Sequence, residues 1–223
     1  MTGAQRPPFH LPAWIAACAA GALLQVWGDG IALWIAAMQA GGLGVAGLTT
    51  LGLITASRLI SGALAGLLQG LALSRRRAWI VRWLIATGLG AGVSFLVINL
   101  LVVQSLEPLS EHPLFAELLA GRSPVPLALM AATGGLILGA VQGFALRRPL
   151  IQAGWWVLCS GIGLLGASLA EALVQRGLAG TGLPVAAGNW NPLAWLVAGA
   201  SMVVYALITG LFWRGLSPAD PPH

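Results

Sequence analysis

GLILGAVQGFALRRPLIQAGWW, residues 135–156, repeats the pattern of an earlier stretch, GALAGLLQGLALSRRRAWIVRW, at residues 62–83. In both stretches three glycines spaced by four positions precede an Arg-Arg pair, and a tryptophan closes the stretch. A shift of 73 residues aligns Gly62, Gly66, Gln69, Gly70, Ala72, Leu73, Arg75 and Trp83 with Gly135, Gly139, Gln142, Gly143, Ala145, Leu146, Arg148 and Trp156. A register this long favours a duplicated two-helix unit over chance.

The composition indicates that most side chains face lipid. Of 223 residues, 58% are hydrophobic and 8% charged, whereas a soluble domain carries about 25% charged residues. A helix needs about 20 apolar residues to cross a bilayer. Five stretches meet this need and a sixth is marginal: about 50–73, 79–103, 124–146, 153–174 and 192–213, with 11–28 as the marginal one. We therefore expect an all-α polytopic membrane bundle of six transmembrane helices in a lipid bilayer.

The repeat extends more weakly to both ends of the chain. Met202, Ala206, Thr209, Gly210 and Arg214 fall where the middle copy has Gly135, Gly139, Gln142, Gly143 and Arg147. At the start, Trp14 and Gly21 follow the spacing of Trp83 and Gly90. The chain is thus expected to form one integral membrane domain, residues 1–223, of three hairpins at about 11–75, 79–148 and 153–214.

Residues 28–51 are apolar but broken by glycine. Gly28, Asp29 and Gly30 interrupt the start, and three more glycines interrupt the middle. A broken helix at membrane depth must be shielded by protein. We expect a short interfacial or re-entrant helix near 31–39, with a seventh span over 31–48 as the alternative.

Arginines set the expected orientation, because loops rich in basic residues stay in the cytoplasm. Eight arginines fall on one side of the predicted spans: Arg6, Arg75, Arg76, Arg77, Arg82, Arg147, Arg148 and Arg214. Arg122 and Arg176 fall on the other side. The protein is therefore expected in the inner (plasma) membrane of the cell, with both termini in the cytoplasm.

The tryptophans divide in the same way, and indole rings favour the headgroup layer. Six fall near the expected inner boundary: Trp14, Trp79, Trp83, Trp155, Trp156 and Trp213. Four fall near the outer boundary: Trp27, Trp34, Trp190 and Trp195. We interpret all of them as markers of the membrane surfaces.

The two glycine triplets are expected to form helix-packing stripes, since glycine lets a neighbouring backbone approach closely. Packing within the chain is the first interpretation, and a face for another subunit is the second. Gln69 and Gln142 lie beside the stripes. An amide in hydrocarbon needs a hydrogen-bond partner, so each is expected to bond to a neighbouring helix, with a ligand contact as the alternative.

Arg58 and Glu171 are the charges well inside predicted spans, both in the outer half. A charge there is costly unless it is paired, solvated or able to reach the surface. We expect the two to face the bundle interior and to interact, as a structural ion pair or as part of a substrate or ion site with Asn99; the third alternative is that each side chain reaches the membrane surface separately.

No catalytic arrangement is evident. None of the three histidines falls inside a predicted span, so haem or zinc ligation by paired histidines has no support. The net charge of +5 would suggest nucleic acid only on a water-soluble fold with a basic face. We expect a non-enzymatic protein without cofactor, metal or nucleic-acid partner.

The doubled pattern from glycine stripe to tryptophan resembles a group of uncharacterised bacterial multi-pass proteins with similar repeats, over about residues 60–92 and 133–166. That resemblance implies no activity. Six helices, inside termini and a long apolar first loop are also similar to the substrate-binding components of energy-coupling vitamin transporters. This second likeness would make Ala13, Ala17 and Gly21 a docking stripe.

Two functional classes therefore remain open. The first is a packing or accessory subunit of a membrane assembly, which binds other membrane protein subunits. The second is a small-solute transporter or the substrate-binding membrane subunit of one. A polar cavity around Arg58, Glu171 and Asn99 would favour the second class, and a tightly filled centre would favour the first.

Overall fold

The computed structural model describes residues 9–39, 48–74, 76–109, 124–146, 150–179 and 192–215. Within these residues the chain forms six helices and no strand: α1 (Leu11–Gln39), α2 (Leu48–Leu73), α3 (Arg77–Leu109), α5 (Val125–Leu146), α6 (Leu150–Ala179) and α7 (Pro192–Gly215). All six are long and apolar enough to cross a membrane. The prediction of an all-α bundle of six membrane-spanning helices is confirmed, and the fold defines a multi-pass membrane protein.

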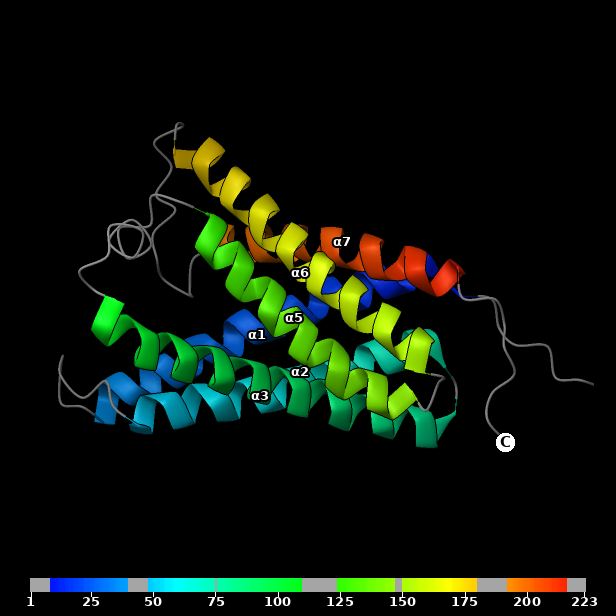
Figure 1. The fold of residues 1–223 in the computed structure, drawn as a ribbon, viewed down its shortest axis with the longest axis horizontal. Coiled ribbons are helices and arrows are strands. Elements are labelled where there is room, and N and C mark those ends of the chain that lie inside the picture. The colour runs from blue at the N-terminus through cyan, green and yellow to red at the C-terminus, as the bar shows by residue number, and fades with distance from the viewer. Residues whose placement is uncertain are drawn as a thin grey trace, which may run out of the picture.

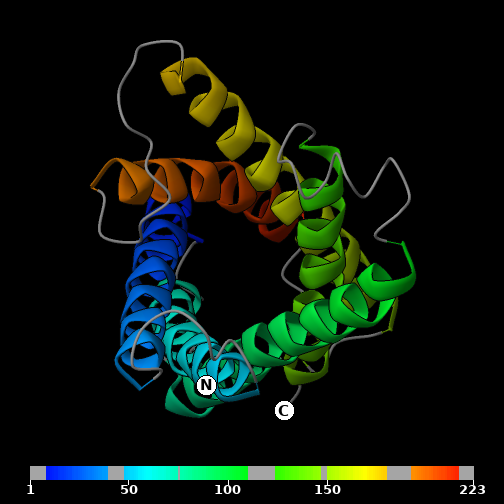
Figure 2. The same ribbon diagram turned by 90° about the vertical axis from the view of Figure 1, so that its left-hand side faces the viewer.

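The helices form a closed ring (Figure 2). Each helix packs against the helix before it and the helix after it, and α1 packs against α7. Neighbours in sequence run in opposite directions along the bundle (Figure 1). The first and last helices therefore pack side by side, as consecutive helices of the chain do.

The two ends of the bundle differ. The starts of α1, α3 and α6 and the ends of α2, α5 and α7 share one end (Figure 1). We call it the tryptophan end, because Trp14, Trp83 and Trp156 lie buried in this half, and we call the opposite end the far end. Arg76, Arg77, Arg82 and Arg214 lie at the tryptophan end and Arg176 near the far end, whereas Arg6, Arg75, Arg122, Arg147 and Arg148 lie outside the described residues.

Local chemistry fixes the connections at the helix ends. Ser74 Oγ accepts a hydrogen bond from the Arg76 backbone N–H at 3.1 Å, and the Trp79 N–H donates to the Arg76 carbonyl at 3.0 Å. The short connection between α2 and α3 places α3 directly beside α2. Pro192 is the first residue of α7, where proline is tolerated because its missing N–H has no helical partner.

Helix α1 continues through Gly28, Asp29 and Gly30 to Gln39, so the predicted separate helix near 31–39 is wrong. Those residues are the last turns of α1, and no seventh helix occurs among the described residues. A Cβ on Gly28 would lie 2.6 Å from Ser57 Oγ, so this glycine allows α2 to approach. Asp29 pairs with Arg58, which removes much of the cost of a carboxylate in the helix.

The glycine stripes bring backbones into contact within the chain. A Cβ on Gly62 would lie 3.1 Å from the Thr87 carbonyl oxygen, and one on Gly66 would lie 2.7 Å from Thr87 Cβ. Between α5 and α6 a Cβ on Gly139 would lie 2.8 Å from Ser160 Cβ, and one on Gly135 would collide with the Ser160 carbonyl. Packing within the chain, the first interpretation of the stripes, is confirmed for these glycines. Gly70 and Gly143 have looser contacts, at 3.2 and 3.5 Å.

The proposed docking stripe on α1 is largely occupied. Ala17 is buried, and a Cβ on Gly21 would lie 2.7 Å from Ala65 Cβ of α2. Ala13 alone of the three is exposed. The stripe predicted from the likeness to vitamin transporters is therefore wrong, because α2 of the same chain covers it.

Candidate functional site

Three tryptophans close the centre of the ring at the tryptophan end. Trp14, Trp83 and Trp156 are at most 1% exposed. The ring centroids of Trp83 and Trp156 are 5.6 Å apart, and those of Trp14 and Trp156 are 6.4 Å apart. Trp213 lies 5.3 Å from Trp156 and 6.2 Å from Trp83. These four indoles form a plug, which we call the tryptophan plug.

Each buried tryptophan donates a hydrogen bond to the helix that precedes it around the ring. Trp83 Nε1 donates to Gln69 Oε1 at 3.2 Å, and Trp156 Nε1 donates to Gln142 Oε1 at 3.1 Å. Trp14 Nε1 donates to Thr209 Oγ1 at 3.1 Å, which joins the last helix to the first. The residues that the sequence pattern aligns thus make the same contact three times.

Each glutamine amide also contacts the helix on its other side, so the donors continue in the same direction around the ring. Gln142 Nε2 donates to Thr87 Oγ1 at 2.9 Å, and Gln69 Nε2 approaches Cys18 Sγ at 3.5 Å. The interhelical hydrogen bonds expected of both glutamines are confirmed. The third unit differs because threonine is shorter: Thr209 Oγ1 donates to its own helix at the Tyr205 carbonyl, 2.8 Å away.

The tryptophans show where the sequence interpretation was incomplete. Trp14, Trp83 and Trp156 lie in the half that was expected, but they are core residues and not markers of a headgroup layer. Trp27, Trp34 and Trp155 are 49–58% exposed, as an interfacial residue would be, and Trp190 lies outside the described residues. The missed signal was the 73-residue shift, which aligns Trp83 and Trp156 as strictly as it aligns the two glutamines.

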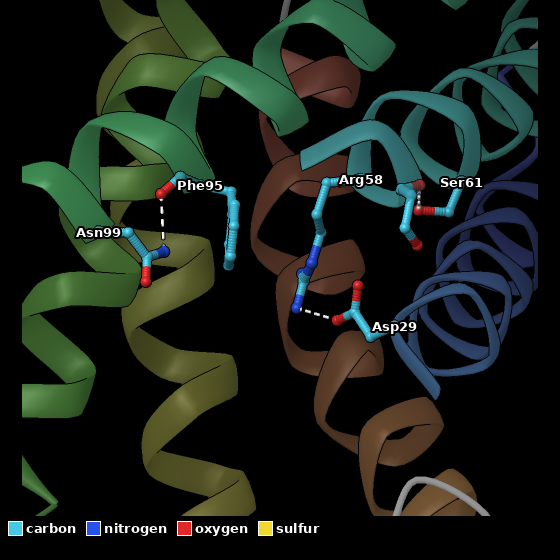
Figure 3. Close-up of polar contacts among 6 residues, drawn as sticks. Asp29, Arg58, Ser61, Phe95 and Asn99 are labelled. Carbon is cyan, nitrogen blue, oxygen red and sulfur yellow. Dashed lines mark hydrogen bonds and ion pairs between the residues drawn. The ribbon is translucent and has the colours of Figure 1, made fainter. Parts of the chain in front are cut away.

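Charged residues lie in the other half of the bundle. Arg58 of α2 pairs with Asp29 of α1, and its guanidinium carbon lies 5.6 Å from the centre of the Phe95 ring (Figure 3). The expected pair of Arg58 with Glu171 is wrong. Asp29 lies within α1, although the sequence places it where the apolar stretch is interrupted, so the carboxylate that contacts Arg58 comes from α1. Arg58 Nε is buried and has no hydrogen-bond partner in the described part of the chain.

Asn99 and Glu171 do not join this pair. Asn99 Nδ2 donates to the Phe95 carbonyl of its own helix at 2.8 Å, next to the arginine (Figure 3). Glu171 Oε1 accepts a hydrogen bond from Gln175 Nε2 at 3.0 Å, also within one helix. The candidate polar residues therefore occupy four places: Gln69 and Gln142 in the ring of interhelical bonds with the buried tryptophans, Cys18 and Thr87, which we call the hydrogen-bonded belt; the Arg58–Asp29 pair; Asn99; and Glu171.

Glu171 lines an open groove of about 390 Å³ between α3, α5 and α6 towards the far end. The groove walls are mostly apolar, with Ser168, Glu171 and Gln175 as the polar side chains: Ile98, Pro124, Leu127, Met130, Ala131, Ser168, Glu171, Ala172 and Gln175. This volume is within the range of small-molecule sites, about 300–1,000 Å³. The groove can hold a small solute with one polar group directed at α6.

Comparisons of the chain with protein families, with characterised proteins and with solved structures gave no match. Among the described residues no three His, Cys, Asp or Glu side chains gather where they could hold a metal ion.

Proposed function

We propose that the protein is a non-enzymatic, substrate-binding membrane subunit that takes up a small solute from the far end. The carrying observation is the groove at Glu171, together with a ring whose opposite half is closed. The eight largest fully buried side chains all belong to the tryptophan half: Trp14, Trp83, Trp156, Tyr205, Gln142, Thr209, Cys18 and Ser160. A ring with one filled half is suited to bind a solute and not to conduct it.

A polar cavity was expected to favour solute binding, and a tightly filled centre was expected to favour a packing subunit. Among the described residues the largest fully buried side chains lie around the tryptophan plug, whereas the charged residues Asp29, Arg58 and Glu171 lie in the far half. Binding sites between helices of a bundle are typically apolar with a few placed polar groups. The groove has this composition.

Co-purification tests the proposal. The full chain, purified in a mild non-ionic detergent and analysed by native mass spectrometry, is expected to retain a small molecule. Leu127→Trp, which fills the groove from α5, should abolish retention, while Gly177→Ala should preserve it because a Cβ there meets no atom within 4 Å. Absence of any retained molecule from the wild-type chain, or equal retention by Leu127→Trp, would contradict the proposal.

The orientation is part of the same proposal. Basic residues favour the cytoplasmic side, and Arg76, Arg77, Arg82 and Arg214 support cytoplasmic termini in the plasma membrane. The groove then opens away from the cytoplasm. A green fluorescent protein fused to the C-terminus should fluoresce, whereas alkaline phosphatase fused there should be inactive; the reverse result would overturn the orientation.

The three hairpins are, on this proposal, copies of one two-helix unit. The 73-residue shift and the three equivalent tryptophan bonds support it. Further support comes from glycine contacts inside each hairpin, where Gly21, Gly90 and Gly163 approach Ala65, Leu138 and Tyr205 respectively. Because these pairs occupy aligned positions, corresponding residues in the three units can be compared directly.

A second candidate, a packing subunit, is favoured by one surface at the tryptophan end. Phe144, Leu150 and Ile151 are 77–90% exposed, and Trp155 beside them is 58% exposed. The aligned residues Arg77, Ala78 and Arg82 replace three of these four with charged or small side chains at the α2–α3 turn. An apolar surface where the other turn carries arginine fits another membrane protein subunit.

Charge reversal of this surface tests the second candidate. Leu150→Arg combined with Trp155→Arg reproduces the aligned charges and should release a bound subunit, seen as a lower mass of the purified complex. An unchanged mass would contradict a subunit interface at this turn.

A further inference from the structure

A second set of aligned positions lies roughly three helical turns from the hydrogen-bonded belt, since eleven residues make about three turns. Eleven residues after Cys18, Thr87 and Ser160 stand Asp29, Ile98 and Glu171. Eleven residues before Gln69, Gln142 and Thr209 stand Arg58, Ala131 and Ala198. Residues eleven positions apart lie on nearly the same face of a helix, so each of these six positions lies on the face that carries its belt residue.

In the first hairpin this set is a complete ion pair. Asp29 of α1 meets Arg58 of α2, and the two side chains are 14% and 30% exposed. In the second hairpin both positions are apolar, Ile98 and Ala131. In each of the first two hairpins the charges at the two aligned positions therefore sum to zero.

The third hairpin keeps the carboxylate and lacks the cation. Glu171 stands where Asp29 does, but Ala198 stands where Arg58 does. No arginine or histidine of the described residues pairs with Glu171, whose bond is to the Gln175 amide. A carboxylate at membrane depth without a cation is costly.

The missing cation has room beside Glu171. Ala131, the residue aligned with Arg58 in the second hairpin, lines the same groove as Glu171. Alanine at this position leaves open the space that a longer side chain would fill. Ile98 and Leu127 give the groove apolar walls on the side facing the carboxylate.

The walls also limit the kind of cation. A divalent metal ion needs about six oxygen ligands, and Glu171 is the single carboxylate among the described residues that line this groove. Among these same lining residues an anion would meet a negative charge and no arginine. An organic ammonium ion needs one carboxylate for its charge and apolar contacts for its body.

We infer that the groove binds a small organic ammonium ion, with Glu171 as its counter-ion and Ile98, Leu127 and Ala131 around its apolar body. The inference rests on the proposed function, because it names the class of solute. The ligand supplies Glu171 with the positive charge that Arg58 supplies to Asp29 in the first hairpin.

Calorimetric titration of the purified full chain in non-ionic detergent tests this inference, with n-butylammonium as the probe. Wild type should bind n-butylammonium and neither n-butanol nor n-butyrate measurably. Glu171→Gln keeps the shape and the Gln175 contact but removes the charge, and should weaken binding by about tenfold or more. Gly177→Ala is the matched control and should bind as wild type does.

A second variant supplies the positive charge from a side chain of the protein itself. Ala198→Arg restores the residue aligned with Arg58, so it should pair with Glu171, raise the unfolding temperature and abolish n-butylammonium binding. The rise should vanish in the double variant with Glu171→Gln. If Ala198→Arg fails to fold, the Glu171→Gln titration still decides.

Two results would overturn the inference. One is absence of n-butylammonium binding by wild type, and the other is equal binding by Glu171→Gln. A neutral or anionic molecule that co-purifies with wild type and is lost in Leu127→Trp would overturn the inference and leave the proposed function intact.

Discussion

Gln142 holds three helices together with a single side chain. It is fully buried, accepts from Trp156 Nε1 and donates to Thr87 Oγ1. Gln142→Met keeps the volume but leaves an indole N–H and a hydroxyl without this partner. We expect the apparent free energy of unfolding, measured by SDS titration in micelles, to fall by about 1–3 kcal/mol.

Gln69→Met provides the matched comparison. Gln69 makes the same bond to a tryptophan, but its second contact is to Cys18 Sγ at 3.5 Å, and sulfur is a weak acceptor. The loss should therefore be smaller than for Gln142→Met. An equal or larger loss would show that the amide bond to Thr87 contributes nothing beyond the bond to the tryptophan.

Arg58 should be energetically coupled to Asp29 and independent of Glu171. A double-mutant cycle of Arg58→Met with Asp29→Leu is expected to give an interaction energy of about 1–3 kcal/mol, because the side chains are in direct contact. The same cycle with Glu171→Leu should be additive within about 0.5 kcal/mol. Coupling to Glu171 as strong as to Asp29 would contradict the observed pairing.

At the scale of the helix, the glycines of one stripe differ in their contacts. A Cβ at Gly135 would collide with the Ser160 carbonyl and lie 2.9 Å from Gly161 Cα, whereas a Cβ at Gly143 would lie 3.5 Å from Ala153 Cβ. Gly135→Ala must push α5 and α6 apart and should cost about 1–3 kcal/mol. Gly143→Ala should change stability by less than about 0.5 kcal/mol.

Thermal unfolding of the two variants, followed by circular dichroism, measures this difference. Gly154→Ala serves as the control, because a Cβ at Gly154 meets no atom within 4 Å. If Gly135→Ala unfolds at the wild-type temperature, the close contact between α5 and α6 is not needed for stability.

The sequence predicted the helices more fully than their partners. Apolar length is a local property, so six spans could be located from residues in order. The sequence predicts too early an end for helix α1, because adjacent glycine and aspartate disfavour a helix. Arg58, which pairs with this aspartate, lies on the next helix. A rule based on neighbouring residues in the sequence therefore cannot find it.

The candidate site shows the same division. Gln69 and Gln142 could be assigned to interhelical bonds, because any amide in hydrocarbon needs a partner. Their particular partners, and the groove at Glu171, depend on how α3, α5 and α6 meet. Tryptophan suits both a headgroup layer and a hydrogen-bonded core, so composition alone could not separate Trp155 from Trp156.

At the scale of the whole molecule, closure of the ring brings the start of α1 against the end of α7, as the other junctions bring consecutive helices together. Trp14 bonds to Thr209 as Trp83 bonds to Gln69, and Gly210 lies against Leu11 and Trp14. On the proposed repeat, the α7–α1 junction therefore corresponds to the α2–α3 and α5–α6 junctions. Its stability then depends on the contacts and not on the order of the chain.

A circular permutant tests this equivalence. The permutant begins at Arg76, runs to His223, continues directly with Met1 and ends at Ser74. It retains every helix and exchanges one junction for another of the same kind. We expect a loss below about 1 kcal/mol, which corresponds to about 2–4 °C in the unfolding temperature.

Thr209→Val provides the internal check, because it removes the acceptor of the Trp14 bond. It should destabilise the permutant and the natural chain equally, since the junction is the same in both. A permutant that aggregates, or one that is insensitive to Thr209→Val, would mean that α1 reaches α7 only after the earlier helices have assembled in their natural order. Closure of the ring would then be a consequence of the chain's order and not a third equivalent junction.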